Sequence, residues 1–407
     1  MSGAGRDAPD TQQTRGAKHD LTLRVVSSLD EVEAAAWDAC ANPADLPYDP
    51  FVSHTFLKAL EDAGCVGPSS GWLPQHLLAV TSTGRLAAVV PSYLKSHSRG
   101  EYIFDDGWAE AYERAGGAYY PKLQCAVPFT PVPGRRLLVA DATERQALEP
   151  ILASALAEVT RQLAASSYHV TFLSEDEWRR LGAIGLLQRT GKQFHWQNRG
   201  YRSFDDFLAT LASRKRKALK RERREALASG IEIEWLTGRD ITEAHWDAFF
   251  AFYMDTGSRK WGRPYLNRAF FSLLGERMAE HCLLVMAKRD GGYIAGALNM
   301  IGGDCLFGRY WGAVEHHPFL HFEVCYYQAI DFAIARGLER VEAGAQGEHK
   351  LLRGYEPVLV YSVHYIPDTG FRRAVANYLE RERHHVEEER EILSRYGPYR
   401  RDGERGA

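Results

Sequence analysis

The stretch HFEVCYYQAIDFAIARGLERVEAGAQGEHKLLRGYEP, residues 321–357, contains a helix pattern, a strand pattern and a dense polar cluster in direct succession. Apolar residues recur at helical spacing over 322–334, and Gly337 follows as a C-cap. Residues 338–343 then read as a short strand, and eight of the eleven positions in 344–354 are polar or glycine. Because α/β proteins place chemistry in loops after buried strands, we interpret this stretch as the centre of a functional site.

The order of elements around this stretch occurs twice in the chain. HCLLVMAKRDGGYIAGALNMI (281–301) resembles HLLAVTSTGRLAAVVPSYLK (76–95) in its hydrophobic pattern and in the position of its turn. The helix pattern of 144–164 and the strand pattern of 168–173 then correspond to the helix and strand of the opening stretch. An internal repeat of about 170 residues predicts two units of similar fold, one in each half.

The repeat predicts an α/β (α+β) fold with two tandem domains, each built on a mixed central sheet. The N-terminal residues have no apolar signal core and read as a disordered tail. We expect this tail over 1–20, an N-terminal domain over 21–199, a basic helical arm over 200–230, a C-terminal domain over 231–380 and a charged tail over 381–407.

Length and composition are those of a soluble two-domain protein. The chain of 407 residues is long enough for two cores, and its net charge of −3 gives no general attraction to nucleic acid or anionic membranes. No apolar run approaches the roughly 20 residues that cross a bilayer. The six cysteines are scattered without a CxxC pair, which predicts reduced thiols in a cytoplasmic protein, with no disulfide and no metal site.

The arm is strongly basic. Residues 213–225 hold eight Lys or Arg against two Glu. A solvated helix is the usual explanation of a charge run, but such helices usually mix both signs, so the imbalance favours polyanion binding. A nucleotide-linked precursor, a tRNA acceptor end or a CoA phosphate would fit, and the cations that we expect to bind it are Arg214, Lys215, Arg216 and Lys217.

Several segments are similar to a known family. They resemble the FemAB-like group of GNAT-fold proteins, labelled predicted N-acyltransferases or peptidoglycan biosynthesis/recognition proteins. The resemblance covers about residues 21–380. It rests on FVSHTFLKALEDAGCVGPSSGWLPQH (51–76), HSRGEYIFDDGWAEAYERAG (97–116), YYPKLQCAVPFTPVPGRR (119–136), KWGRPYLNRAFF (260–271), LHFEVCYYQAI (320–330) and EAGAQGEHKLLRGYEPV (342–358).

This resemblance implies two tandem GNAT-like domains and transfer of an acyl or aminoacyl group to a small-molecule or peptide amine. The donor it implies is acyl-CoA or aminoacyl-tRNA, with no further cofactor. GNAT members that bind acetyl-CoA carry a Q/R-x-x-G-x-G/A loop, whose N–H groups hold a pyrophosphate. Here RYWGAVEHHPFLHF (309–322) stands in that place; Arg309 and Gly312 fit the first half, but Val314 replaces the next glycine.

Acyl transfer to an amine needs a group that accepts a proton and donors that stabilise an oxyanion. We expect Glu342, on the strand of the opening stretch, or Glu323, in the first turn of its helix, to be the general base, with His349 as a third candidate. The alternatives are a solvated charge at a strand end for Glu342 and a carboxylate that stabilises a helix N-terminus for Glu323.

Substrate-binding residues are expected in and beside the polar loop. Lys350 and Arg353 lie three apart and are expected to clamp a phosphate, although exposed surface cations are the alternative. His321 and Cys325 lie four apart, but a helical cysteine is usually part of a core, so a Cys–His nucleophile is disfavoured. The remaining candidates in this region are Gln346, Glu348, His321, Tyr310 and Trp311.

The acceptor side is expected to come from two aromatic segments. Residues 96–134 are rich in aromatics, glycine and proline, and we expect an ordered, irregular surface there. Aromatic packing of a long crossover is the alternative to a binding role. The candidate residues are His97, Glu101, Asp105, Tyr120 and Lys122 in this segment, and Lys260, Trp261 and Tyr265 in the second.

Two functions are therefore compatible with the sequence. The first is an N-acyltransferase whose reaction centre lies in the C-terminal half, because the counterpart of the polar loop in the first half, residues 174–185, lacks the Gly-Glu-His-Lys cluster. The second is a non-catalytic pair of GNAT-like domains that recognises a cell-wall precursor or an RNA. The altered phosphate loop favours the second function, and the dense polar run 342–354 favours the first.

Overall fold

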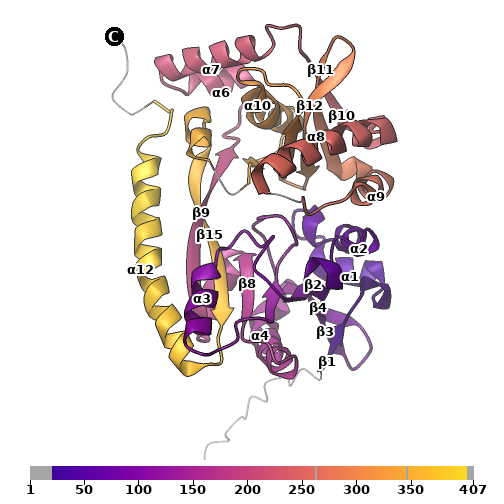
Figure 1. Cartoon of the computed structure of the whole chain (residues 1–407), viewed down its shortest axis with the longest axis vertical. Coiled ribbons are helices and arrows are strands. Elements are labelled where there is room, and N and C mark those ends of the chain that lie inside the picture. Colours follow the sequence, from indigo (N-terminus) through magenta and orange to yellow (C-terminus); the bar gives the residue numbers. More distant parts are fainter. Residues whose placement is uncertain (1–20, 262–263, 345–346, 401–407) are drawn as a thin grey trace, which may run out of the picture.

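The computed structural model describes residues 21–261, 264–344 and 347–400, with side chains left out over 258–261. Two α/β halves lie one above the other, the N-terminal half at the lower end of Figure 1 and the C-terminal half at the upper end. The elements of the first half are β1 (Leu21–Val26), α1 (Ala34–Ala41), α2 (His54–Asp62), β2 (Trp72–Pro74), β3 (His76–Thr81), β4 (Leu86–Val90), β5 (Ser92–Lys95), α3 (Asp106–Arg114), β6 (Lys122–Cys125), β7 (Leu138–Val139), α4 (Arg145–Gln162), β8 (Tyr168–Leu173), α5 (Glu175–Ala183) and β9 (Leu187–Gln197).

The second half begins with the arm and ends with the longest helix of the described residues. Its elements are α6 (Phe204–Ala209), α7 (Ser213–Ala226), β10 (Glu232–Thr237), α8 (Glu243–Trp261), α9 (Arg268–Met278), β11 (Cys282–Arg289), β12 (Gly292–Ile301), β13 (Cys305–Ala313), α10 (Leu320–Phe322), a π-helical turn (Glu323–Tyr327), α11 (Gln328–Arg336), β14 (Arg340–Glu342), a 3-10 helix (Glu348–Arg353), β15 (Glu356–Tyr365) and α12 (Thr369–Ser394).

Two sheets organise these elements, a smaller one that is antiparallel throughout and a larger one that is mixed. A four-stranded sheet has the order β1-β3-β4-β7, and an eleven-stranded sheet has the order β10-β11-β12-β13-β14-β9-β15-β8-β6-β5-β2. The hairpins β3-β4 and β11-β12 are each extended by an antiparallel strand, β7 and β13. This equivalence confirms the tandem GNAT-like fold expected from the repeat.

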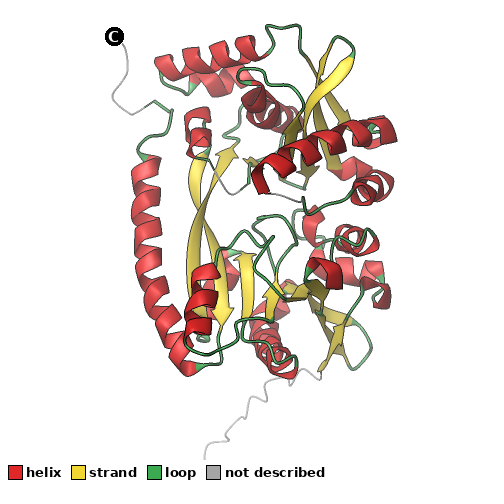
Figure 2. Cartoon of the chain, viewed as in Figure 1, coloured by secondary structure: helices red, strands yellow, loops and turns green. Residues whose placement is uncertain are grey.

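The closing strands of the two halves are exchanged. β9 belongs to the first half in sequence but pairs with β14, whereas β15 follows the second half and pairs with β8. β9 and β15 also pair with each other, so they form a long ribbon through both halves, and α12 packs along it (Figure 2). The domain limits at 199 and 231 remain a prediction, and the exchange ties the two halves together.

Local chemistry explains where the expected elements differ from those observed. In the segment 76–95, the part after the turn divides into β4 and β5 because Pro91 between them cannot donate to a ladder. The expectation of an irregular surface over 96–134 was wrong in part, since α3 and β6 form inside it. Helix α5 begins with a capping box in which the Ser174 side chain accepts from the Glu177 N–H and Glu177 accepts from the Ser174 N–H.

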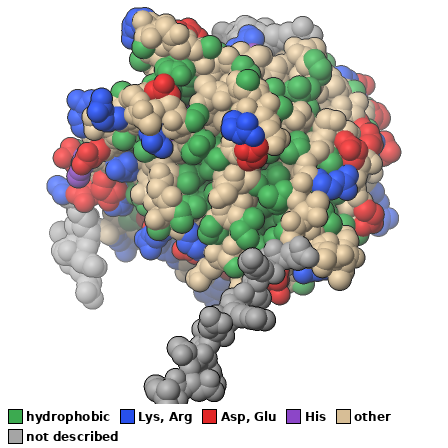
Figure 3. Space-filling model, turned by 90° about the horizontal axis from the view of Figure 1, so that it is seen from below, with side chains coloured by type: hydrophobic (Ala, Val, Ile, Leu, Met, Phe, Trp, Pro, Cys, Tyr) green, Lys and Arg blue, Asp and Glu red, His purple; other side chains and the backbone are tan. Residues whose placement is uncertain are grey.

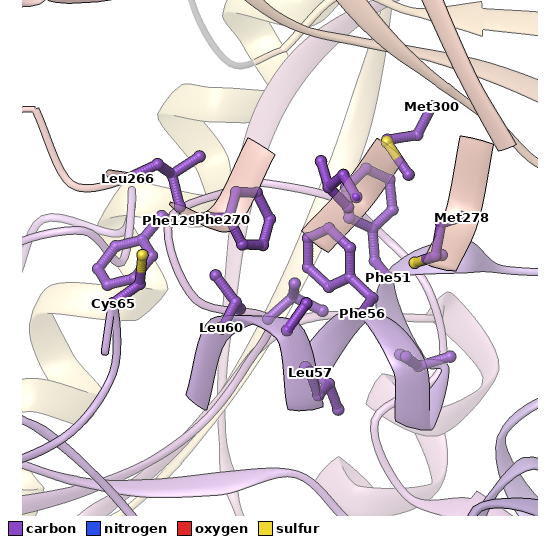
Figure 4. Packing of buried hydrophobic residues seen from close by; sticks show 14 of the residues in the cluster. Phe51, Phe56, Leu57, Leu60, Cys65, Phe129, Leu266, Phe270, Met278 and Met300 are labelled. Carbon is purple, nitrogen blue, oxygen red and sulfur yellow. The ribbon is translucent and has the colours of Figure 1, made fainter. Parts of the chain in front are cut away.

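A hydrophobic core continues across the junction of the two halves (Figure 4). Phe51, Phe56 and Leu60 from the first half lie against Phe270 and Met300 from the second. Burial of apolar surface stabilises by roughly 25 cal/mol per Å², so a shared core resists separation of the halves. We therefore treat the junction as a fixed boundary for any cleft that lies beside it.

Polar contacts add to this junction. Arg277 Nη1 donates to Asp62 Oδ2 at 2.6 Å, and Tyr310 OH donates to the Phe129 carbonyl at 2.9 Å. The Tyr265 ring stacks on the Phe129 ring with centroids 5.0 Å apart. The irregular segment thus meets β13 through the Phe129 carbonyl and meets the loop before α9 through the Phe129 ring.

The two ends of the molecule differ in surface character. The lower end, where β1 exposes Leu23 and Val25, carries apolar side chains over much of its middle and charges of both signs mainly toward the rim (Figure 3). Helix α7, with its run of cations, lies at the opposite end (Figure 1). Among the described helices, none combines the length and the apolar character needed to cross a bilayer.

Candidate active site

The central feature of the second half is a split between two parallel strands. β13 and β14 pair only from Cys305 opposite Arg340 to Phe307 opposite Glu342, and β13 then continues to Ala313 with β12 as its remaining strand partner among the described residues. At the same place the register between β12 and β13 skips Arg309, which forms a bulge. The edge of β13 beyond Phe307 therefore faces open space where a neighbouring strand would lie.

The helix beside the split contains a π-helical turn over Glu323–Tyr327, a feature that is frequent at functional sites. The His321 ring lies 5.2 Å from the Trp311 ring and 5.3 Å from the Tyr326 ring, between centroids. The helix thus places a ring of its own against β13.

Three adjoining cavities follow β13 along the split. An inner cavity of about 120 Å³ is lined by Asn299, Cys325 and Tyr326 among others. A middle cavity of about 250 Å³ reaches Tyr102 in the first half, and an outer cavity of about 530 Å³ opens along 313–322. Trp311 and His321 line all three, so the cavities form one cleft, which we call the β13 cleft.

Histidines and a tyrosine make a chain of polar groups at the cleft. The Tyr326 hydroxyl is 2.9 Å from His349 Nε2, and the His321 ring lies 6.1 Å from the His349 ring. Burial raises the pKa of Tyr326 far above its usual value, so its hydroxyl keeps its proton. Of the two histidines, His349 is exposed at the surface and His321 lines the cleft.

Lys350 supports the loop that follows β14 and does not point into solvent. Its side chain is buried, and its Nζ donates to the carbonyls of Ala343 at 2.6 Å and Gly344 at 3.1 Å. Burial, helped by the nearby Arg309 charge, lowers the pKa of Lys350 to about 7. These contacts hold the turn that follows β14. Lys350 was expected to clamp a phosphate, but two backbone carbonyls already accept hydrogen bonds from its ammonium group.

Glu342 lies buried at the end of β14 between two arginines. Arg309 Nη2 and Arg340 Nε each reach one of its carboxylate oxygens at 3.4 Å. His195 stands opposite it on β9, and burial lowers the pKa of that imidazole. Glu342 itself does not line the cleft, although Ala343 next to it does.

Glu323 is held by the arm. Its fully buried carboxylate accepts from Arg223 Nη2 at 2.8 Å and from Gln328 Nε2 at 2.7 Å. Burial raises the pKa of Glu323, and Arg223 opposes that rise. These contacts direct the carboxylate toward α7, on the side of the helix away from the cleft cavities.

Arg353 is also tied to the arm. Its Nη2 donates to Glu222 at 2.9 Å, its Nη1 donates to the His349 carbonyl at 2.7 Å, and the guanidinium lies 3.3 Å from the Phe322 ring centroid. The four cations near the start of α7 differ from Arg223, because no carboxylate of the described residues pairs with them: Arg214, Lys215, Arg216 and Lys217. Of these, Arg214 and Lys217 are exposed.

The remaining residues that were expected to bind substrate separate into two groups. Tyr310, Trp311 and Tyr265 line the cleft. Glu101, Asp105 and Lys122 instead form a buried network in which Lys122 Nζ donates to both carboxylates, 2.7 Å from Glu101 and close to Asp105. Two further expected residues lie at the edge of this network. The Tyr120 hydroxyl is hydrogen-bonded to the Ser98 hydroxyl, and His97 Nε2 lies 2.9 Å from the Ser70 carbonyl.

Some expected residues fall outside this description. Gln346 and the side chains of Lys260 and Trp261 lie outside the described residues, and Glu348 is exposed on the 3-10 helix. Sequence patterns missed Tyr102, Tyr253 and Asn299, which line the cleft from three separate elements and carry no motif. Cys325 was expected to be part of a core, but it lines the inner cavity together with His321, which is one helical turn away.

The proposed remnant of a phosphate loop has another explanation. Gly312 lies inside β13, where a Cβ would approach the Phe252 carbonyl oxygen to 2.1 Å, so glycine allows α8 to pack on the strand. Arg309 also lies inside β13 and is buried against Glu342. In the loop that follows, the Val314 N–H bonds to the Ile294 carbonyl and Pro318 has no N–H.

The fold and the cleft together define a tandem GNAT-like protein. The chain belongs to the FemAB-like family, whose model, described as peptidoglycan biosynthesis/recognition, matches residues 28–401. Among proteins with curated functions, none matches it in sequence.

Solved structures share the fold at low identity. The crystal structure of FemX aligns with 87% of this chain and 100% of its own at TM-score 0.53 and 14% identity. A conserved protein of unknown function from Bacteroides thetaiotaomicron aligns with 85% of this chain and 99% of its own at TM-score 0.51 and 13% identity. A tandem GNAT protein from the clavulanic acid biosynthesis pathway aligns with 85% and 97% at TM-score 0.44 and 12% identity.

Proposed function

We propose that this protein is an N-acyltransferase in which an amine attacks an activated acyl group inside the β13 cleft. The observation that carries the proposal is the split itself, where β13 and β14 separate after Phe307 and Glu342 beside the inner cavity of the cleft. An open strand edge supplies backbone N–H groups that are already oriented, and such donors stabilise a developing oxyanion. Membership of the FemAB-like family supports the same reaction class.

His321 is our choice for the general base. It lines all three cavities, whereas Glu342 and Glu323 are buried in ion pairs with arginines and line none of them. In the proposed step the amine nitrogen forms a bond to the acyl carbon and gives a proton to the His321 ring. The bond from that carbon to the donor oxygen or sulfur breaks, and the leaving group takes the proton that His321 has accepted.

Tyr326 and His349 would support this transfer by holding the His321 ring in place. The His321 ring packs on the Tyr326 ring with centroids 5.3 Å apart, and the Tyr326 hydroxyl is 2.9 Å from His349 Nε2, so these two residues would fix the orientation of the His321 ring. Glu342 would act through the fold, because its buried charge lies between Arg309 of β13 and Arg340 of β14, one arginine from each strand of the split. Glu323 would position the helix that carries His321.

We propose aminoacyl-tRNA as the donor in preference to acyl-CoA. The loop after β13 lacks the glycines of a pyrophosphate cradle, and Pro318 removes one of its N–H donors. The unpaired cations from Arg214 to Lys217 offer the kind of surface that binds a phosphate backbone. A cell-wall precursor amine is the acceptor class that fits the family description.

The test is transfer of a labelled aminoacyl group. Purified protein is given a charged tRNA pool or a series of acyl-CoAs, together with a panel of amines, and the amide product is measured by mass spectrometry. We expect His321→Ala to lower kcat by about 100-fold, within the range for loss of a general base, and the exposed His384→Ala on α12 to leave it unchanged. Binding of donors without product, or full activity of His321→Ala, would overturn the proposal.

A further inference from the structure

One guanidinium in the β13 cleft has unused hydrogen-bonding capacity. The Arg309 side chain is 3% exposed and lies over the rings of Phe51 and Phe307. Its Nη1 donates to the Gly308 carbonyl at 2.9 Å, but its buried Nε has no partner among the described residues. A buried, partly unsatisfied cation costs free energy unless another group completes its contacts.

Glu342 does not complete them. Arg309 Nη2 is 3.4 Å from Glu342 Oε2, which is long compared with the roughly 2.8 Å of a strong arginine–carboxylate contact. The same carboxylate is shared with Arg340, also at 3.4 Å through its other oxygen. Arg309 is therefore only loosely held from one side.

Arg309 is also part of the cleft wall. It lines both the inner and the middle cavity, and the described residues that line these two cavities include no aspartate or glutamate. The walls of the middle cavity are mainly aromatic: Tyr102, Tyr253, Tyr265, Tyr310 and Trp311. An arginine in the wall of an aromatic cavity is suited to a small molecule with an anionic group and a flat or apolar body.

We propose that the middle cavity binds the carboxylate of the amine substrate, with Arg309 as its ion-pair partner. The planar fork of a guanidinium matches the two oxygens of a carboxylate, and the tyrosine walls cover the body of the molecule. The acceptor is then an amine that also carries a carboxylate. That this ligand is the acceptor rests on the proposed function, whereas the binding of its carboxylate to Arg309 does not.

The binding test uses matched acids and amides without any donor. Isothermal titration calorimetry compares phenylalanine with phenylalaninamide and 4-aminobenzoate with 4-aminobenzamide, and inorganic phosphate is titrated separately. We expect at least one acid to bind about tenfold or more tightly than its amide, the gain typical of one charge-assisted contact. Equal affinities in every pair, or phosphate binding with no acid binding, would overturn the proposal.

Two variants locate the contact. Arg309→Gln should remove the preference for acids, and Arg309→Lys should keep part of it. Arg340→Gln is the matched control, because Arg340 also contacts Glu342 at 3.4 Å but lines neither cavity, so the preference should survive. Equal loss in both Gln variants would show an indirect effect through Glu342 and contradict the proposal.

The variants remain informative if one of them does not fold. If Arg309→Gln fails to fold, the wild-type pairs and Arg309→Lys still decide the question. Preference for acids without any transfer activity would count against the proposed function alone.

Discussion

Replacing Arg223 with methionine tests whether Glu323 is a structural residue. Arg223 Nη2 is 2.8 Å from Glu323 and 2.7 Å from Asp331, and the Glu323 side chain is fully buried. Methionine keeps the apolar stem but leaves two carboxylates without their cation. Removing one partner of a buried ion pair costs about 3 to 5 kcal/mol, and we expect Arg223→Met to lower the free energy of unfolding by that amount.

Urea denaturation at pH 7.5 measures this loss, and Arg221→Met on the same helix is the control. The side chain of Arg221 is 60% exposed, and its ion-pair partner is Glu225 one turn away. An exposed pair of this kind contributes at most about 0.5 kcal/mol. A loss below about 1 kcal/mol for Arg223→Met would refute the reasoning.

The pH dependence of the unfolding free energy gives a second test of Arg223→Met. Without Arg223 the pKa values of Glu323 and Asp331, which burial already raises, must rise further. A protonated carboxyl is neutral and costs less to bury, so the difference in stability between wild type and variant should shrink between pH 7.5 and pH 5. A difference that grows on acidification would contradict this assignment.

Three further predictions concern buried groups. Because the folded-state pKa of Lys350 is lowered to about 7, the unfolded chain binds more protons between pH 7 and about 10.5, and wild-type stability should rise with pH across that window. In urea titrations, Lys350→Met should reduce the rise of unfolding free energy with pH by up to about 1.4 kcal/mol per pH unit. Part of the rise should remain in this variant, because the pKa of Lys95 is also lowered to about 7. Gly312→Ala should destabilise by about 2 kcal/mol or more in thermal unfolding, since its Cβ meets the Phe252 carbonyl, whereas Gly107→Ala in helix α3 meets nothing within 4 Å and should be neutral or stabilising. Lys122→Met should cost about 3 to 5 kcal/mol in urea denaturation, because Glu101 and Asp105 would remain buried without it; a loss below about 1 kcal/mol would contradict the network.

The hydrophobic periodicity of the sequence and its internal repeat predicted most of the fold. The repeat between 76–95 and 281–301 predicted two equivalent hairpins, and both form as β3-β4 and β11-β12. The exchange of β9 and β15 could not be predicted, because an alternating strand pattern shows which face is buried and does not show which neighbour it pairs with.

The site was predicted less completely than the fold. His321 and Trp311 were expected to contact substrate, and the structure brings both into one cleft. Glu323 and Lys350 were expected to act on substrate, but a sequence cannot show that α7 supplies Arg223 from 100 residues away or that two carbonyls hold the Lys350 ammonium. Tyr102 reaches the cleft only because the two halves share a core.

Alkylation of Cys325 tests the central claim, that the acyl donor occupies the β13 cleft. Cys325 lines the inner cavity and is partly exposed, whereas the other five cysteines are buried, and burial raises the thiol pKa of Cys40 and Cys282 to about 12. Iodoacetamide should therefore label Cys325 first in the native protein, and saturating donor should slow that labelling at least tenfold. Labelling at an unchanged rate with donor bound would place the donor elsewhere and contradict the account.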